Sequence, residues 1–196
     1  MPDAGRVIAG SARGLRLLAP GEGTRPLADR VKQTLFAVLE AGSLGPWPVA
    51  FLDLFAGSGA GGIEALSRGA PRATFVERDR DAARVIAANL ERTRLGGHAT
   101  VLRADVLRIL GGAPEGTGAP FGAVLLDPPY DSATLVAALQ RLAEPGAGWL
   151  ARKAVVVAKH FWREIPPSSI GRLRQVRQRR FGETTLTFYA LEELPA

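Results

Sequence analysis

Residues 51–62 constrain the fold of this chain more than any other stretch. They begin as an apolar run with a single carboxylate, Phe51-Leu-Asp-Leu-Phe-Ala56, and continue as the glycine-rich turn Gly57-Ser-Gly-Ala-Gly-Gly62. A helical pattern follows directly at residues 63–68. A strand that is apolar throughout is typical of a parallel sheet covered by helices on both faces. The stretch therefore predicts a ligand-binding loop between the end of a buried strand and the N-terminus of a helix.

The rest of the chain repeats this alternation. The expected strands are 49–55, 73–77, 100–103, 122–126 and 154–158, and the expected helices are 60–68, 80–93, 106–110 and 133–143. Such alternation predicts an α/β fold, with a mostly parallel sheet and helices on both faces. The final strands, 172–181 and 184–191, are separated only by Gly182-Glu183 and are therefore expected to be antiparallel.

A shorter segment, residues 1–45, precedes the first core strand. Residues 6–18 are expected to form a β-hairpin around a Ser11–Gly14 turn, and residues 28–40 show apolar residues at helical spacing. About 45 residues are few for an independent domain. We expect this extension to pack on the main domain, residues 46–196.

Composition restricts the partners that this chain can take. Its 196 residues carry a formal net charge of +6, supplied mostly by arginine, which favours a polyanion such as nucleic acid. The arginine-rich codon usage of a GC-rich genome would explain the same charge equally well. There is no cysteine and the two histidines are far apart, so no metal site is expected. No apolar run is long enough to span a bilayer and no signal peptide is evident, so we expect a cytoplasmic protein that does not bind membranes.

Four carboxylates stand at the ends of four successive expected strands: Asp53, Glu77, Asp105 and Asp127. The pattern Gly57-x-Gly59-x-x-Gly62 matches a dinucleotide fingerprint, but by itself that match is weak. Asp53 would repel a pyrophosphate and attract a cation. S-adenosylmethionine, with its ammonium and sulfonium groups, therefore suits this loop better than NAD does. An acid at the position of Glu77 is placed to bind ribose hydroxyls, and Asp105 can receive the adenine amino group.

The tetrapeptide Asp127-Pro-Pro-Tyr130 carries the second half of the chemistry. Its two prolines stiffen the loop and remove two N–H donors. The Asp127 carboxylate and the Pro128 carbonyl can accept both hydrogens of an exocyclic amine, and Tyr130 offers a face on which a base can stack. Accepting both hydrogens aims the nitrogen lone pair at a sulfonium methyl, so catalysis would consist mainly of orientation and electrostatics.

At these motifs the chain resembles the class I S-adenosylmethionine-dependent methyltransferases with an (Asn/Asp)-Pro-Pro-Tyr motif. It is more closely similar to the RsmD family of small-subunit (16S) rRNA guanine-N2 methyltransferases. The resemblance includes Arg6-Val-Ile-Ala-Gly10 and Glu64-Ala-Leu-Ser-Arg-Gly-Ala70. Two segments narrow it to this family: Thr24-Arg-Pro26 with Asp29-Arg-Val31, and the closing Phe-Gly-Glu-Thr of Arg180-Phe-Gly-Glu-Thr184. Gly61 departs from the bulkier residue that is usual in the family, from which we expect slightly looser helix packing.

The resemblance implies a Rossmann-like, seven-stranded sheet with the order 3-2-1-4-5-7-6. It also implies a set of site residues. The cofactor S-adenosylmethionine, with S-adenosylhomocysteine as product, is expected at Asp53, Phe55, Ala56, Gly57, Ser58, Gly59, Glu77, Arg78, Asp105, Val106 and Asp127. The catalytic loop is expected at Asp127, Pro128, Pro129 and Tyr130. RNA is expected at Arg6, Arg13, Arg16, Thr24, Arg25 and Arg30. The partner implied is 16S rRNA, free or within a partly assembled small subunit, bound by a monomer.

Three alternatives stay open at this stage. The same fold and tetrapeptide serve adenine-N6 or cytosine-N4 methylation of DNA or RNA. A nucleotide-dependent oxidoreductase would use the glycine loop but not the tetrapeptide. A non-catalytic RNA-binding module would explain the charge but leave the strand-end acids without a role.

Overall fold

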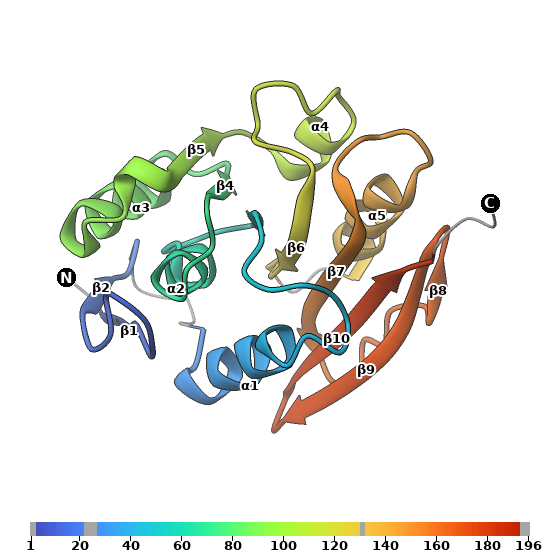
Figure 1. Cartoon of the computed structure of the whole chain (residues 1–196), viewed down its shortest axis with the longest axis horizontal. Coiled ribbons are helices and arrows are strands. Elements are labelled where there is room, and N and C mark those ends of the chain that lie inside the picture. Colours follow the sequence, from blue (N-terminus) through green and yellow to red (C-terminus); the bar gives the residue numbers. More distant parts are fainter. Residues whose placement is uncertain (1–2, 22–26, 130–131, 193–196) are drawn as a thin grey trace.

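The computed structural model describes residues 3–21, 27–129 and 132–192. Its main sheet is built from β3 (Phe51–Leu54), β4 (Ala73–Glu77), β5 (Ala99–Arg103), β6 (Phe121–Leu126), β7 (Leu150–Phe161), β8 (Ser169–Ile170), β9 (Leu173–Phe181) and β10 (Thr184–Leu191). These eight strands have the order β5-β4-β3-β6-β7-β10-β9-β8 (Figure 1). β3 to β7 pair in parallel, whereas β10 lies antiparallel to both β7 and β9. The expected α/β class with an antiparallel ending is confirmed.

The expected count of seven strands was one too few. The additional strand, β8, has only two residues and pairs with the start of β9 through Ser169 and Ile170. A two-residue strand has no hydrophobic period, so sequence patterning cannot reveal it. The other seven strands lie in the expected order. β7 is also much longer than the expected 154–158, because its ends pair with β6 at Leu150 and with β10 at Phe161.

Helices cover both faces of the sheet (Figure 1). They are α1 (Asp29–Glu40), α2 (Ala60–Ser67), α3 (Arg80–Thr93), α4 (Val106–Leu110) and α5 (Ser132–Ala143), with a 3-10 turn η1 at Gly96–His98. On one face, Phe51 packs with Leu35 of α1 and Ile63 of α2, and α3 joins the same core. On the other face, Leu52 packs with Leu139 of α5, and α4 lies in this second core. None of the described helices is long and apolar enough to cross a membrane.

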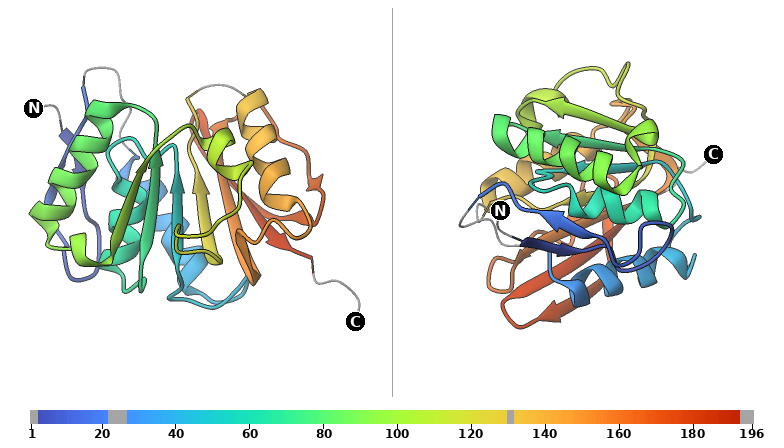
Figure 2. Two further views of the ribbon diagram at one scale, coloured as in Figure 1. Left: turned by 90° about the horizontal axis from the view of Figure 1, so that it is seen from above. Right: turned by 90° about the vertical axis from the view of Figure 1, so that its left-hand side faces the viewer.

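The N-terminal hairpin consists of β1 (Asp3–Arg6) and β2 (Arg16–Leu18). Its first strand begins earlier than the expected residue 6, because Asp3 already pairs with Leu18 of β2. The hairpin lies against α2 and α3, as Figure 2 shows. Leu17 belongs to the same core as Ile63, so the extension packs on the main domain as expected.

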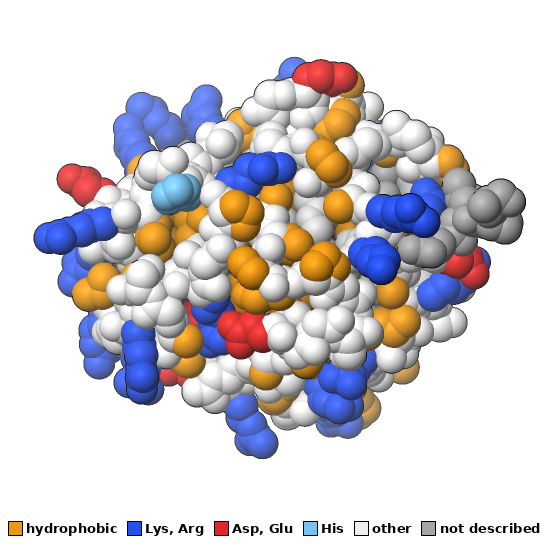
Figure 3. All heavy atoms as spheres, in the orientation of Figure 1, with side chains coloured by type: hydrophobic (Ala, Val, Ile, Leu, Met, Phe, Trp, Pro, Cys, Tyr) orange, Lys and Arg blue, Asp and Glu red, His pale blue; other side chains and the backbone are white. Residues whose placement is uncertain are grey.

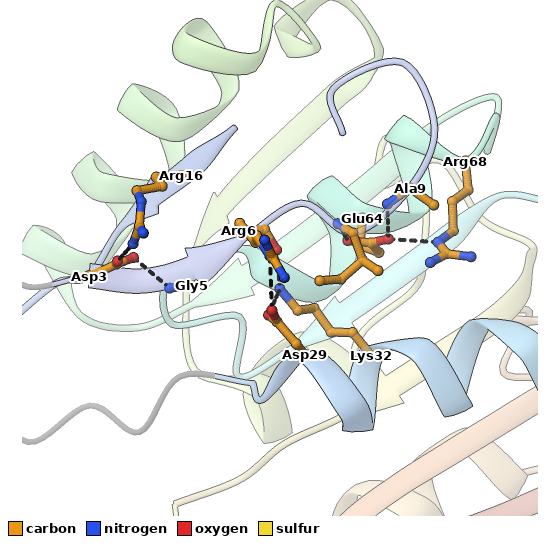
Figure 4. A network of polar contacts seen from close by, with 10 residues as sticks. Asp3, Gly5, Arg6, Ala9, Arg16, Asp29, Lys32, Glu64 and Arg68 are labelled. Carbon is orange, nitrogen blue, oxygen red and sulfur yellow. Dashed lines mark hydrogen bonds and ion pairs between the residues drawn. The ribbon is translucent and has the colours of Figure 1, made fainter. Parts of the chain in front are cut away.

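Buried charges attach this hairpin to the helices behind it (Figure 4). The Glu64 carboxylate, fully buried on α2, accepts the N–H groups of Ile8 at 2.7 Å and Ala9 at 3.1 Å and pairs with Arg68 at 2.7 Å. Lys32, fully buried on α1, donates to the Arg6 carbonyl. Because an unpaired buried charge is costly, these contacts fix the hairpin against α1 and α2.

The packing around Gly61 contradicts the expectation of looser contacts. A Cβ added at this position would lie 2.6 Å from Leu125 Cδ2 and 3.1 Å from Asp53 Oδ2. Leu125 therefore occupies the space that a side chain at position 61 would need, and the helix–sheet contact is tight. The absent side chain also lets the Asp53 carboxylate lie directly against the first turn of α2.

Candidate active site

A pocket of about 940 Å³ opens at the carboxyl ends of the parallel strands. Each of its walls comes from the loop that follows one strand: residues 55–58 after β3, 77–79 after β4, 104–107 after β5 and 127–129 after β6. The carboxyl end of β7, at residues 159–161, adds a fifth wall. Open α/β sheets bind their ligands in this crevice. Pro20, Gly21 and Leu27, which precede α1, also reach the pocket.

The glycine loop forms the pocket wall beside the first strand. Phe55, with φ of +61°, turns the backbone out of β3 in a region that side chains rarely adopt, and such strain is characteristic of functional sites. Gly57, with φ of +53°, follows and donates its N–H to Glu77 Oε2 at 2.9 Å. Gly59 stands beneath the loop rather than in the pocket wall, and a Cβ there would lie 3.2 Å from Ile86. Its role is thus to allow close helix packing.

Asp53 is an acid whose ionisation the pocket strongly perturbs. Its carboxylate is 2% exposed and accepts the Gly62 N–H at 2.7 Å. Burial raises the pKa of the Asp53 carboxyl to about 8; the Gly62 hydrogen bond opposes that rise, and the nearby charges of Asp127 and Glu77 add to it. The three acids therefore repel one another, which makes this part of the pocket a favourable place for a cation.

Asp127 stands at the end of β6 and faces a residue that the sequence did not single out. Leu126 pairs with Ala158, so the next positions, Asp127 and Lys159, lie side by side on adjacent strands. Lys159 Nζ donates to Asp127 Oδ1 at 2.5 Å. Burial raises the pKa of the Asp127 carboxyl, and the Lys159 ammonium opposes that rise. Lys159 thus partly offsets the cost of burying the Asp127 carboxylate in the pocket.

The remaining acids bind the backbone of the loops that carry them. Glu77 accepts the N–H groups of Gly57 and Asp79, which fixes the carboxylate at the pocket wall between the two loops. Asp105 caps the N-terminus of α4 by accepting the Arg108 N–H at 3.0 Å. Both side chains line the pocket with acceptor oxygens, which suits hydroxyl and amino groups of a nucleoside.

The structure thus gathers nearly all of the expected cofactor and catalytic residues. Those that line the pocket are Asp53, Phe55, Ala56, Gly57, Ser58, Glu77, Arg78, Asp105, Val106, Asp127, Pro128 and Pro129. Gly59 supports the loop from below, and Tyr130 lies outside the described residues. The fit to S-adenosylmethionine rests on the chemistry of this set: an acidic wall for cationic groups, backbone N–H groups at a helix N-terminus, and acceptors for a nucleoside.

Sequence reasoning missed the wall formed by β7 and β10. Lys159, His160, Phe161 and Glu164 line the pocket together with Thr184. His160 is mostly buried and its two ring nitrogens contact the Phe161 carbonyl and Thr187 Oγ1, both at 2.8 Å. Burial lowers the pKa of His160, so it is a neutral structural side chain at pH 7. The available signal was the position of Lys159 directly after the expected strand 154–158, the same kind of position that singled out Asp127.

The expected RNA-binding arginines lie apart from the pocket wall. Arg6, Arg13 and Arg16 are exposed on the hairpin, and Arg30 is exposed on α1, whereas Thr24 and Arg25 lie outside the described residues. Arg6 pairs with Asp29 at 3.1 Å, yet its side chain remains 62% exposed. Lys and Arg side chains project around the rim of the face shown in Figure 3. A charged rim of this kind favours a polyanionic partner.

Fold and pocket together define the class of protein. The sheet order, the glycine loop and the strand-end acids are those of a class I S-adenosylmethionine-dependent methyltransferase fold. The chain shares its fold with an RNA methyltransferase from Salinibacter ruber that was solved in complex with S-adenosyl-L-homocysteine. The two structures superimpose with a TM-score of 0.63 at 17% identity, over 87% of this chain and 96% of that one.

The chain belongs to the family described as "Conserved hypothetical protein 95", whose profile matches residues 5–190. It is 39% identical to the "Putative rRNA methyltransferase YlbH" of Bacillus subtilis (strain 168), over 94% of this chain and 97% of that protein. It is also 39% identical to the "Ribosomal RNA small subunit methyltransferase D" of Escherichia coli (strain K12), over 77% and 72%. The solved structure of the "Putative methyltransferase yhhF from Escherichia coli" superimposes with a TM-score of 0.83 at 32% identity, covering 96% of this chain and 98% of that one. The expected resemblance to the RsmD family is confirmed.

Proposed function

We propose that this protein transfers a methyl group from S-adenosylmethionine to the exocyclic N2 of a guanine in small-subunit (16S) rRNA. One observation carries the proposal: the Asp127 carboxylate and the Gly57–Glu77 corner line the same pocket. A methyl donor held at the glycine loop and an amine held at Asp127 are then close enough to react. The relative from E. coli, named for the small-subunit ribosomal RNA, supports this choice of substrate.

The residues of the chain act by binding and orientation. Asp127 and the Pro128 carbonyl accept the two hydrogens of the amine, which turns the nitrogen lone pair towards the donor. S-adenosylmethionine supplies a methyl group on a sulfonium, so the new N–C bond forms as the S–C bond breaks and its electron pair stays on sulfur. The nitrogen then loses one proton, for which the adjacent Asp127 carboxylate is the nearest acceptor.

The N-terminal extension, residues 1–45, serves in this proposal as the RNA-binding part, and residues 46–196 as the catalytic domain. The hairpin carries exposed arginines and continues into Pro20 and Gly21 at the pocket. RNA held by the hairpin would therefore lead directly to the catalytic loop. The target guanine must leave its stack to enter, which favours a loop or a flipped nucleotide. We place the protein in the cytoplasm as a monomer.

The decisive experiment measures tritiated methyl transfer onto under-methylated small subunits and onto naked 16S rRNA, with nucleoside mass spectrometry of the product. Appearance of N2-methylguanosine supports the proposal, and the better of the two substrates shows whether assembly is required. Methylated adenine or cytosine in the product would instead show that the protein methylates adenine N6 or cytosine N4.

The role of Asp127 has its own control. Asp127→Ala is expected to abolish transfer while calorimetry still detects S-adenosylmethionine binding, because the glycine loop is intact. Asp81→Ala removes an exposed carboxylate on α3, outside the pocket, and should leave the activity unchanged. Full activity of Asp127→Ala would refute the assignment of the catalytic loop.

A further inference from the structure

The ion pair between Lys159 and Asp127 offers a row of hydrogen-bonding groups to the pocket. Lys159 Nζ stands 2.5 Å from Asp127 Oδ1, and the two side chains are only 17% and 24% exposed. The register of β6 and β7 sets them side by side, and both line the pocket. Read across the pair, the groups are one N–H donor, then one carboxylate oxygen, then a second carboxylate oxygen.

We propose that Lys159 selects guanine by donating a hydrogen bond to its O6 while Asp127 accepts the N1–H and an N2–H. This inference rests on the proposed function and names the residue that sets its base specificity. The Watson–Crick edge of guanine carries one acceptor and then two donors, O6, N1–H and N2–H. The sequence donor, acceptor, acceptor along the ion pair is its complement, the same order that cytosine presents to guanine. The Pro128 carbonyl remains for the second N2 hydrogen.

Adenine and cytosine do not match this array. In both bases the ring nitrogen next to the amine is an acceptor. If the amine occupied the outer carboxylate oxygen, that ring nitrogen would face the other oxygen and repel it. If the ring nitrogen accepted a hydrogen bond from Lys159 instead, the amine would lie opposite the inner carboxylate oxygen. It would then be one position away from the place where the guanine N2 meets the methyl donor. Misplacement by about 1 Å already lowers a rate about 100-fold.

Lys159 is well placed to make this contact. Lys159 and Arg78 supply the ammonium and guanidinium groups among the described residues that line the pocket, and Arg78 follows β4, next to Glu77. The other titratable groups around the pocket are the acids Asp53, Glu77, Asp79, Asp105 and Glu164 and the buried His160. Burial raises the pKa of the Asp127 carboxyl and the Lys159 ammonium opposes that rise, so the lysine favours the ionised form, which accepts two N–H groups.

The test is a double-mutant cycle in which the Lys159 side chain and the guanine O6 atom are altered separately and together. Synthetic RNA carrying the mapped target site is prepared with either guanine or 6-thioguanine, which keeps the N1–H and the N2 amine but carries a weakly accepting sulfur in place of O6. Wild type, Lys159→Met, Lys159→Gln and the control Lys153→Met are compared by kcat/KM. Lys153 is an exposed lysine on the same strand. On guanine, Lys159→Met should lose about 10- to 150-fold, the range expected for a hydrogen bond to a charged group.

On 6-thioguanine, the same variant should lose much less than on guanine, because the sulfur accepts only a weak hydrogen bond from Lys159. Lys159→Gln, which keeps an N–H donor, should recover part of the guanine activity, and Lys153→Met should behave as wild type on both bases. An equal loss on both bases would mean that Lys159 acts only through Asp127, and no loss on guanine would mean that it makes no contact; either result overturns the proposal. Failure of the proposed function is distinguishable, because then wild type itself forms no N2-methylguanosine. If Lys159→Met does not fold, as judged by circular dichroism, the cycle is completed with Lys159→Ala, which also lacks the donor.

Discussion

The raised pKa of Asp53 leads to a specific prediction about cofactor binding. In the ligand-free protein this carboxyl titrates near pH 8, because it is buried and lies near the charges of Asp127 and Glu77. A cationic ligand favours the ionised form. Binding of S-adenosylmethionine should therefore release a proton at neutral pH, and the affinity should rise with pH.

The magnitude follows from the fraction of Asp53 that is ionised. With a pKa of about 8, roughly 1% is ionised at pH 6 and about half at pH 8. If only the ionised form binds, the dissociation constant should fall about 50-fold over this range and level off above it. The sign for stability is the reverse. The folded state holds a proton that the unfolded state has lost above about pH 4, so stability without ligand should fall between about pH 4 and 8, by up to about 1.4 kcal/mol per pH unit.

The assay is isothermal titration calorimetry with S-adenosylmethionine at pH 6, 7 and 8, in buffers of different ionisation enthalpy so that the released proton is counted. Asp53→Asn is the control. It keeps an acceptor for the Gly62 N–H but cannot ionise, so it reports the titration of the ligand's own amino group. We expect this variant to bind weakly without the rise seen in wild type, and to unfold at higher denaturant than wild type at pH 8. A wild-type dissociation constant that does not change from pH 6 to 8 would refute the reasoning.

Three other perturbations test the packing and the RNA surface. Glu64→Gln should lower the free energy of unfolding by about 3–5 kcal/mol in urea titrations, because Lys32 and Arg68 lose the buried carboxylate that compensates their charges. Glu40→Gln, at the exposed end of the same network, should cost less than about 1 kcal/mol. Gly61→Ala should cost about 1–3 kcal/mol through the contact with Leu125, and the open position Gly97→Ala should not; equal effects would contradict the packing argument. The affinity for 16S rRNA should fall with salt, and Arg13→Ala should reduce the slope of log K against log salt by about 0.7–0.9 if that side chain neutralises one phosphate; an unchanged slope would remove Arg13 from the interface.

The sequence predicted those parts of the fold that repeat with a regular period. The helix at 80–93 and the strands at 73–77 and 184–191 have the expected bounds, because a helical period, a short apolar run and an alternating pattern, respectively, mark them in the sequence. β8 and the ends of β7 escaped prediction because pairing with neighbouring strands, rather than local pattern, determines them. The position of Gly61 was misjudged for a similar reason: the residue that fills its space, Leu125, is 64 positions away in the chain.

In the candidate site, too, the sequence predicts local features but not contacts between distant residues. Acids at strand ends could be expected from the chain alone, because parallel strands bring their carboxyl ends to one edge. That Asp53 faces Gly62, or that Asp127 faces Lys159, depends on strand order and register. Lys159 belongs to a strand that adjoins β6 only in space, 32 residues later in the chain. A lysine after an apolar run has many ordinary explanations, and only its neighbour gives it a chemical role.

The buried charges under the hairpin connect the two halves of the proposed function. Glu64 holds the N–H groups of Ile8 and Ala9, and Lys32 holds the Arg6 carbonyl, so lifting the hairpin from the helices would expose or orphan two buried charges (Figure 4). The same helix, α2, begins at the glycine loop and receives the Asp53 carboxylate at Gly62. Arginines on the hairpin are therefore held at a fixed position relative to the pocket. If they bind RNA, the fixed hairpin sets the distance between the bound RNA backbone and the reactive base. Weakening the Glu64 network should then lower methyl transfer to RNA more than it lowers cofactor binding.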